Sequence, residues 1–146
     1  MNNVPNPNTT SIGMDGNLAA LLSYLIGIIG IIVLVTEKEN KFVKFHALQA
    51  LLFHLTFVVI IFGAFIVFFI FAMVGSVAAA ALGKAGAIIG IIIYFVAIII
   101  WFAAIILGPL TVIAGNIYGG IQAYNGKWFK IPILGNLACK FLGITI

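Results

Sequence analysis

The chain has 146 residues, of which 64% are hydrophobic and 7% are charged, and its mean hydropathy is +1.32. Soluble domains carry about 25% charged residues, so this composition excludes an ordinary soluble domain and predicts an integral membrane protein. The net charge of +4 comes from lysines that cluster beside apolar segments, where they set orientation and contact anionic lipid headgroups; we expect no nucleic-acid partner.

Residues 1–16 are polar and rich in Asn, Pro and Thr, which is typical of a disordered tail. Asn17 is a plausible helix N-cap for a first membrane span at about 18–36. No basic region precedes this span, so we expect an anchor that is retained and not a cleaved leader. Small residues recur every four positions in it and predict a helix-packing stripe: Ala19, Ser23 and Gly27.

A polar, lysine-rich loop at 36–41 leads into the second predicted span, at about 47–74. This span is rich in phenylalanine, and its only polar side chains after Leu51 are His54 and Thr56. The segment Gly75–Gly86, with an alanine run and Lys84, is expected to be a short connection.

The third apolar block, at about 87–124, would form a helix about 55 Å long, whereas the hydrocarbon core is about 30 Å thick. Gly108 and Pro109 lie in its middle, and proline kinks or ends a helix. The block is therefore one long, kinked span or two spans split at Gly108-Pro109. Its second half carries another small-residue packing stripe: Thr111, Gly115, Gly119 and Ala123.

Charge favours three spans over four. With three spans, the basic loop and the basic tail lie together on the cytoplasmic side, as the positive-inside rule requires. The predicted fold is thus an all-α membrane bundle, with a transmembrane domain at 17–140 and a basic interfacial segment at 125–146. Four spans remain the alternative.

Few side chains in the chain can carry chemistry. His46 and Gln49 lie one helical turn apart, and His54 follows two turns later. No nucleophile with a nearby base, acid pair or phosphate loop is present, so we expect no enzyme, no cofactor and no metal site; Cys139 is expected to be an inert thiol.

Two segments carry a family resemblance: Glu37–Ala50 with its Phe-His-Ala-x-Gln run, and Ala123–Asn136 with Gly-Lys-aromatic-x-x-Pro-x-x-Gly. They resemble the signature of the small bacterial and archaeal membrane proteins grouped with the twenty-kilodalton subunit of the chloroplast inner-envelope import translocon. The resemblance implies a component of a protein-conducting assembly. It marks these positions as signature residues: Phe45, His46, Gln49, Lys127, Pro132 and Gly135.

We therefore expect a multi-pass protein of the cell membrane that acts as a scaffold or translocon-like subunit. Its expected partners are lipid, further copies of the chain or other membrane proteins. The alternative is a small channel or carrier whose path passes near His46 and Gln49 and includes these polar residues: His54, Asn116 and Gln122.

Overall fold

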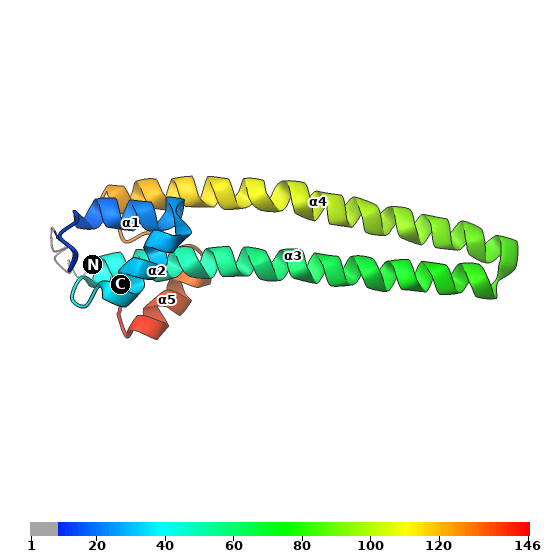
Figure 1. Ribbon diagram of the computed structural model, residues 1–146, viewed down its shortest axis with the longest axis horizontal. Helices are drawn as coiled ribbons and strands as arrows, with labels where there is room; N and C mark the ends of the chain where they lie inside the picture. The colour runs from blue at the N-terminus through cyan, green and yellow to red at the C-terminus, as the bar shows by residue number, and fades with distance from the viewer. Residues whose placement is uncertain (1–8) are drawn as a thin grey trace. The chain divides into compact units, whose positions relative to one another are not determined.

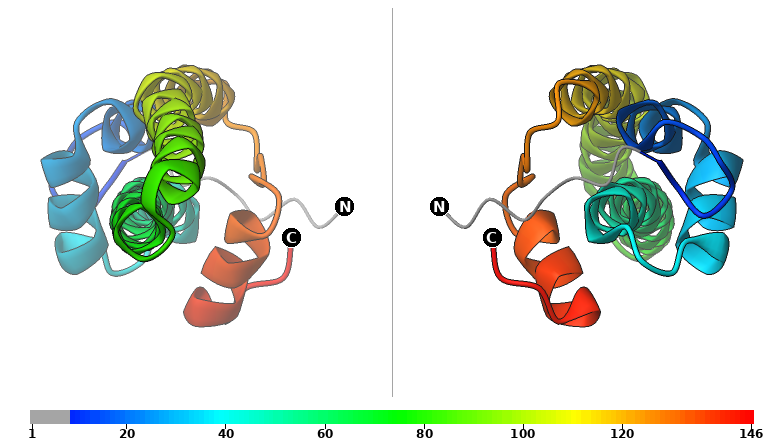
Figure 2. Two further views of the ribbon diagram at one scale, coloured as in Figure 1. Left: turned by 90° about the vertical axis from the view of Figure 1, so that its right-hand side faces the viewer. Right: turned by 90° about the vertical axis from the view of Figure 1, so that its left-hand side faces the viewer.

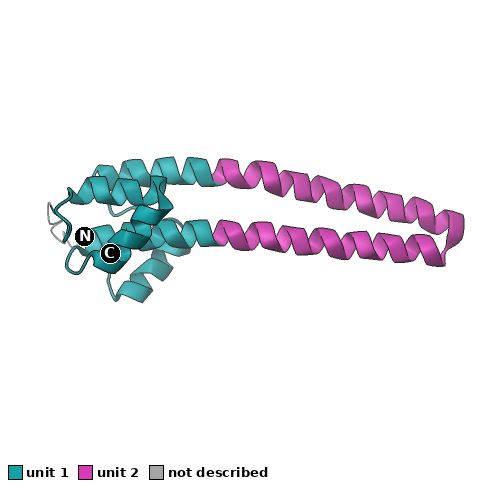
Figure 3. Ribbon diagram, viewed as in Figure 1, with its two compact units in different colours: residues 1–55, 112–146 teal, residues 56–111 magenta. Residues whose placement is uncertain are grey.

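The computed structural model describes residues 9–146, so the first half of the expected disordered tail lies outside the described residues. The described chain is helical (Figure 1), with these elements: α1 (Gly16–Leu25), α2 (Gly27–Thr36), α3 (Lys41–Ala81), α4 (Gly83–Tyr124) and α5 (Leu134–Leu142). It divides into two compact units (Figure 3). Unit 1 contains the chain up to Leu55 and from Val112 onward, and unit 2 contains Thr56–Thr111.

The predicted first span is two short helices and not one. The chain is extended at Ile26, where φ is −130° and ψ is 95°, between the ten-residue helices α1 and α2. Each helix is about 15 Å long, half the thickness of a hydrocarbon core. The backbone of Gly30 packs against Ser23, since a Cβ at Gly30 would lie 3.2 Å from the Ser23 carbonyl oxygen. In a straight helix these two residues would be about 10 Å apart along the axis, so the packing requires the break.

The two ends of this apolar segment lie next to each other. The Ser11 amide donates to Glu37 Oε2 at 2.7 Å, and the Ser11 hydroxyl donates to Glu37 Oε1 at 2.8 Å. The Lys38 amide in turn donates to the Ser11 hydroxyl at 3.3 Å. A segment whose start and end are hydrogen-bonded cannot begin on one side of a bilayer and end on the other. In place of the single helix predicted at 18–36, the chain has two short helices whose outer ends meet.

Residues 9–15, which the sequence placed in the polar tail, form an ordered loop. Thr10 and Met14 exchange backbone and side-chain hydrogen bonds of 2.8 to 3.1 Å. Asp15 then caps α1 by accepting the Leu18 amide at 2.9 Å, in place of the expected cap Asn17.

The connection between the two long helices is shorter than predicted. Only Leu82 separates α3 from α4, and Gly83 makes the turn with φ at +59°. The expected connection at Gly75–Gly86 is mostly helical, because the alanine run consists of the strongest helix former. α4 runs unbroken through Pro109, so the block is not split there. A helix in a membrane bundle tolerates the one lost backbone donor of a proline.

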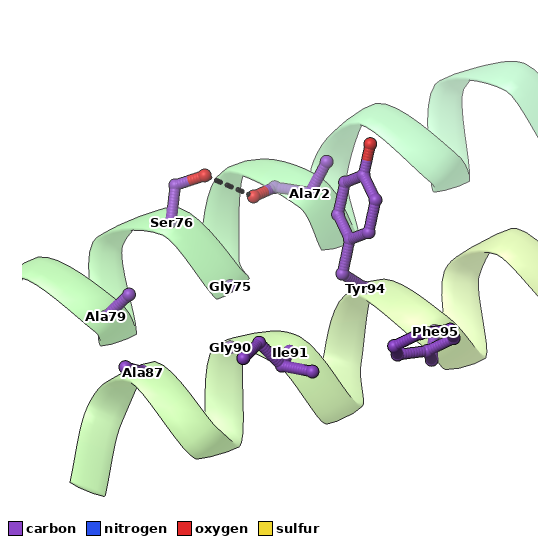
Figure 4. A pocket seen from close by; sticks show the side chains of 9 residues that line it. All are labelled: Ala72, Gly75, Ser76, Ala79, Ala87, Gly90, Ile91, Tyr94 and Phe95. Atoms are coloured by element: carbon purple, nitrogen blue, oxygen red, sulfur yellow. Dashed lines mark hydrogen bonds between the residues drawn. The ribbon is translucent and has the colours of Figure 1, made fainter. Parts of the chain in front are cut away.

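Unit 2 consists of the facing parts of α3 and α4. Their backbones approach closely where two glycines meet: a Cβ at Gly90 would lie 2.5 Å from the Gly75 carbonyl oxygen. Beside this contact is an apolar hollow of about 330 Å³, in which the Ser76 hydroxyl turns back to the Ala72 carbonyl oxygen (Figure 4). Further along, Phe68 packs against Tyr94 and Trp101 at ring distances of 5.9 and 5.6 Å.

Both long helices are apolar enough to cross a membrane, and their most apolar stretches are almost entirely unburied within the protein. Large side chains such as Val59, Phe62 and Met73 on α3, and Ile92, Phe95 and Ile99 on α4, are more than half exposed. Exposed apolar side chains all along two helices need a lipid environment, since a soluble protein would bury them. The chain is thus a membrane protein with two candidate spans.

Unit 1 has its core around the beginning of α3. In Figure 2, α2 lies on one side of this part of α3 and α5 lies on the other. One cluster of buried side chains joins α1, α2 and α3 and includes Tyr24 and Phe42. A second joins Phe45 of α3 to Ala138 and Cys139 of α5.

Candidate functional site

A closed hydrogen-bond network lies at the centre of unit 1. It consists of Tyr24 from α1 and of His46 and Gln49 from α3, all with 0% exposure, together with backbone groups of the segment that follows α4. His46 Nε2 lies 3.1 Å from the Lys127 carbonyl oxygen, and His46 Nδ1 lies 3.1 Å from the Tyr24 hydroxyl.

The geometry fixes the tautomer of His46. A carbonyl oxygen only accepts, so Nε2 carries the proton and donates it to Lys127. Nδ1 is then the acceptor for the Tyr24 hydroxyl. The Tyr24 oxygen itself accepts Gln49 Nε2 at 2.6 Å, so every polar atom of the imidazole and of the phenol has a partner.

Gln49 connects this pair to the end of the chain. Its Nε2 also donates to the Phe129 carbonyl oxygen at 3.0 Å, and its Oε1 accepts the Ile131 amide at 3.0 Å. One glutamine side chain thus binds the backbone of two residues in a segment without regular secondary structure. Backbone groups there have no helix or sheet partner and need a side chain instead.

Aromatic rings surround the imidazole. Phe42, Phe45 and Tyr24 approach it edge to face at ring distances of 4.6, 5.0 and 5.8 Å. Trp128 packs against both phenylalanines, at 5.2 and 5.5 Å. Apolar rings therefore enclose the imidazole, and Tyr24, His46 and Gln49 are fully buried by the described part of the chain.

The turn before α5 is tight and strained. The Leu134 amide donates to the Pro132 carbonyl oxygen at 2.8 Å, and Ile133 between them has φ at +69° and ψ at −57°. These are the angles of the classic γ-turn, which is rare and costly for a β-branched residue. The turn lets Gly135 approach the network so closely that a Cβ there would lie 2.6 Å from Gln49 Oε1.

The structure therefore brings most of the predicted signature residues together. Phe45, His46 and Gln49 contact the segment that contains Lys127, Pro132 and Gly135, although Lys127 takes part through its backbone carbonyl and its side chain is exposed.

The residues of the predicted polar path do not form a continuous path. His54 Nδ1 donates to the Ala50 carbonyl oxygen at 2.8 Å, and its Nε2 accepts Asn116 Nδ2 at 3.1 Å. Asn116 Oδ1 is buried and has no hydrogen-bond partner in the described part of the chain. Gln122 is half-buried and makes no hydrogen bond to this pair. His46 and Gln49 belong to the separate closed network.

The predicted packing stripes are used in part. Ala19 and Ser23 are buried, whereas Gly27 follows the break and would tolerate a Cβ without contact. On α4, a Cβ at Gly115 would lie 2.5 Å from the Phe53 ring, and one at Gly119 would lie 2.8 Å from the Tyr24 ring. Ala123 is fully buried, but Thr111 is exposed and its hydroxyl binds the Leu107 carbonyl oxygen.

Glu37 organises the loop before α3. Burial raises the pKa of its carboxyl group, but hydrogen bonds from Ser11 and from the Asn40 and Glu39 amides outweigh this effect and lower the pKa to about 2. The residue holds the loop and is not placed to bind an ion, because four donors already occupy its two oxygens. Among the described residues, no three His, Cys, Asp or Glu side chains are grouped to hold a metal ion.

Two central residues were not singled out from the sequence. Tyr24 is one of two polar side chains in an otherwise apolar segment, and this isolation is the signal that a buried partner exists. Glu37 lies in a charged loop, and its hydrogen-bond partner Ser11 lies in the polar N-terminal segment. Nothing in the sequence indicates that these two residues meet.

Comparisons with known proteins identify one family. Residues 8–138 match the model of the magnetosome magnetite crystal formation protein family, a bacterial membrane family. No curated protein and no solved structure matches the chain. The match contradicts the expected resemblance to the chloroplast import translocon, which is wrong. In this chain the two quoted segments contribute residues to the hydrogen-bond network of unit 1.

Proposed function

The chain belongs to the magnetosome magnetite crystal formation protein family, and we propose that it supports crystal formation as a scaffold in the magnetosome membrane. It does so without a catalytic group and without a conducting path of its own. The observation that carries this proposal is the closed network of Tyr24, His46 and Gln49, in which three fully buried polar side chains bind one another and the backbone.

We further propose that the chain crosses the membrane twice, with unit 2 as a helical hairpin. The part of α3 in unit 2 is about 39 Å long at 1.5 Å per residue, which suits a tilted span across a core of about 30 Å. The hydrogen bonds between Ser11 and Glu37 support a re-entrant or interfacial place for α1 and α2, which start and end on one side.

The distribution of charge supports the same arrangement. Two spans keep six lysines of the chain in unit 1, on the cytoplasmic face: Lys38, Lys41, Lys44, Lys127, Lys130 and Lys140. Only the turn with Lys84 then reaches the lumen. A lysine-bearing turn with no acidic residue is a poor ligand for iron, so the contribution to crystal formation comes from unit 1 and the partners it organises.

The test is complementation in a magnetite-forming bacterium from which the gene has been deleted. Crystal size is measured by electron microscopy after expression of the wild type, K84Q or Q49L at equal membrane abundance. We expect the wild type and K84Q to restore crystal size, because the lumenal turn does no chemistry. Q49L, which opens the network of unit 1, should fail to restore it.

The reverse pattern would overturn the proposal. If K84Q abolished complementation while inserting normally, the lumenal turn would act on the mineral directly. If Q49L restored crystals fully although its melting temperature had fallen, an intact unit 1 would not be what the crystals need.

A further inference from the structure

Three lysines line a small hollow in unit 1, at the beginning of α3. The hollow measures about 180 Å³ and is lined by Lys38, Lys41, Lys44 and, from the end of α5, Leu142. A second hollow of about 180 Å³ also has Lys41 in its wall, together with Trp128 and residues 143–146. Neither hollow belongs to the closed network of Tyr24, His46 and Gln49.

The three positive charges have no negative partner in the described part of the chain. None of the three ammonium groups forms an ion pair or a hydrogen bond there. Two carboxylates lie in the same loop: Glu37 accepts hydrogen bonds from Ser11 and from backbone amides, and Glu39 is an exposed side chain that forms no ion pair with the three lysines. Lys44 is half-buried, so solvent screens its charge less than that of a fully exposed lysine.

The helix adds to the positive potential. The first turn of α3 contains no acidic residue, although acidic residues are favoured at this end of a helix and lysines are not. Two amides of this turn are already paired with Asn40: the Val43 amide donates to Asn40 Oδ1 and the Lys44 amide donates to the Asn40 carbonyl oxygen, both at 3.1 Å. Three of the four residues that line the hollow are lysines.

We infer that this hollow binds a phosphate group, carried by an anionic phospholipid. Three lysines that line one hollow provide positive charge and hydrogen-bond donors of the kind that phosphate oxygens require. Apolar and aromatic neighbours suit the rest of a lipid: Leu142 lines the hollow, Phe141 is 68% exposed, and Trp128 lies beside Lys41. A free phosphate ion shares the headgroup chemistry, and the experiment separates the two sources.

The experiment measures the melting temperature of the full-length protein in a neutral detergent against ligand concentration. The probes are dioctanoyl phosphatidylglycerol, dioctanoyl phosphatidylcholine and inorganic phosphate. The variant K41Q/K44Q removes two charges from the hollow. Its matched control K84Q/K140Q removes two charges from lysines that do not line it, so both proteins have the same net charge.

We expect phosphatidylglycerol to stabilise the wild type and K84Q/K140Q alike. Its apparent affinity for K41Q/K44Q should fall by about tenfold or more, because two charge-assisted hydrogen bonds are lost. Without ligand, K41Q/K44Q should melt at the same or a higher temperature, since like charges at a helix N-terminus repel. If it melts lower, K38Q, a change in the exposed loop, serves in its place.

Three other results decide between the remaining explanations. If inorganic phosphate binds as tightly as phosphatidylglycerol and also depends on Lys41 and Lys44, the phosphate site stands and its ligand is a soluble phosphate. Equal binding of phosphatidylcholine would overturn the inference. An equal loss of affinity in both double variants would also overturn it, because net charge alone would then explain the binding.

Discussion

At the scale of single residues, the buried polar side chains in unit 1 act as connectors. Tyr24, His46 and Gln49 come from two helices, and they bind the backbone of a third segment at Lys127, Phe129 and Ile131. A chain with 7% charged residues has few means of specifying how apolar helices pack, because apolar surfaces alone give many similar arrangements. The network selects one of them.

Replacing Gln49 tests this role. Q49L would leave the half-buried Ile131 amide and Phe129 carbonyl oxygen without their partner, at up to about 1–3 kcal/mol for each group. We expect the melting temperature in detergent to fall clearly. The matched control is Q122L, which makes the same change at a half-buried glutamine of α4 outside the network, and it should melt close to the wild type. Equal losses in both variants would contradict a special role for Gln49.

Glu37 makes the stability of unit 1 depend on acid. Its folded-state pKa of about 2 lies below the usual 4.5, so its contribution is complete above about pH 5 and is lost as the pH falls from 4.5 towards 2. The wild-type melting temperature should decline over this range. E37Q should start lower at pH 6 and decline less.

The control for this titration is E39Q, which changes the neighbouring exposed glutamate. It should keep the acid dependence of the wild type. An E37Q protein whose melting temperature declines as steeply as that of the wild type would assign the titration to another carboxyl group.

At the scale of elements, the positions of helices in the described chain could be predicted better than their ends. The spans expected at 47–74 and 87–124 lie within α3 and α4, because long apolar runs have few alternatives. The break at Ile26 could not be predicted, since it depends on the packing of Gly30 against Ser23 and on the bond between Ser11 and Glu37. Likewise, helical spacing predicts that His46 and Gln49 lie one turn apart on the same helix. Their hydrogen-bond partners depend on the tertiary fold and could not be predicted.

Some glycines of the long helices are needed for close packing, whereas others face open space. G119A would place a methyl group 2.8 Å from the Tyr24 ring, which is buried and held by hydrogen bonds, so overpacking should cost about 1–3 kcal/mol. The matched control G63A meets no atom within 4 Å in the middle of α3 and should stabilise by about 0.5–1 kcal/mol through helix propensity. Detergent melting measures both. Equal effects would mean that α1 and α4 do not pack closely at Gly119.

At the scale of the whole molecule, the proposed two-span arrangement predicts which side chains a membrane-impermeant reagent can reach. Cys139 is buried, so a C139A background is suitable for introducing a single exposed thiol. In intact magnetosome vesicles, whose cytoplasmic face points outward, a membrane-impermeant maleimide should label K140C readily. K84C should react only after the membrane is opened with detergent. Labelling of K84C in intact vesicles would exclude the hairpin, and protection of K140C would place unit 1 in the lumen.

Only Leu82 separates α3 from α4, and this short link constrains how the chain is inserted during its synthesis. α3 could not insert by itself without carrying the start of α4 with it, because one residue joins the two helices. For the proposed hairpin we expect the two helices to enter together, with Gly75 already packed against Gly90 during insertion. In the proposed two-span topology, the turn that has to cross the membrane carries one charged side chain, Lys84.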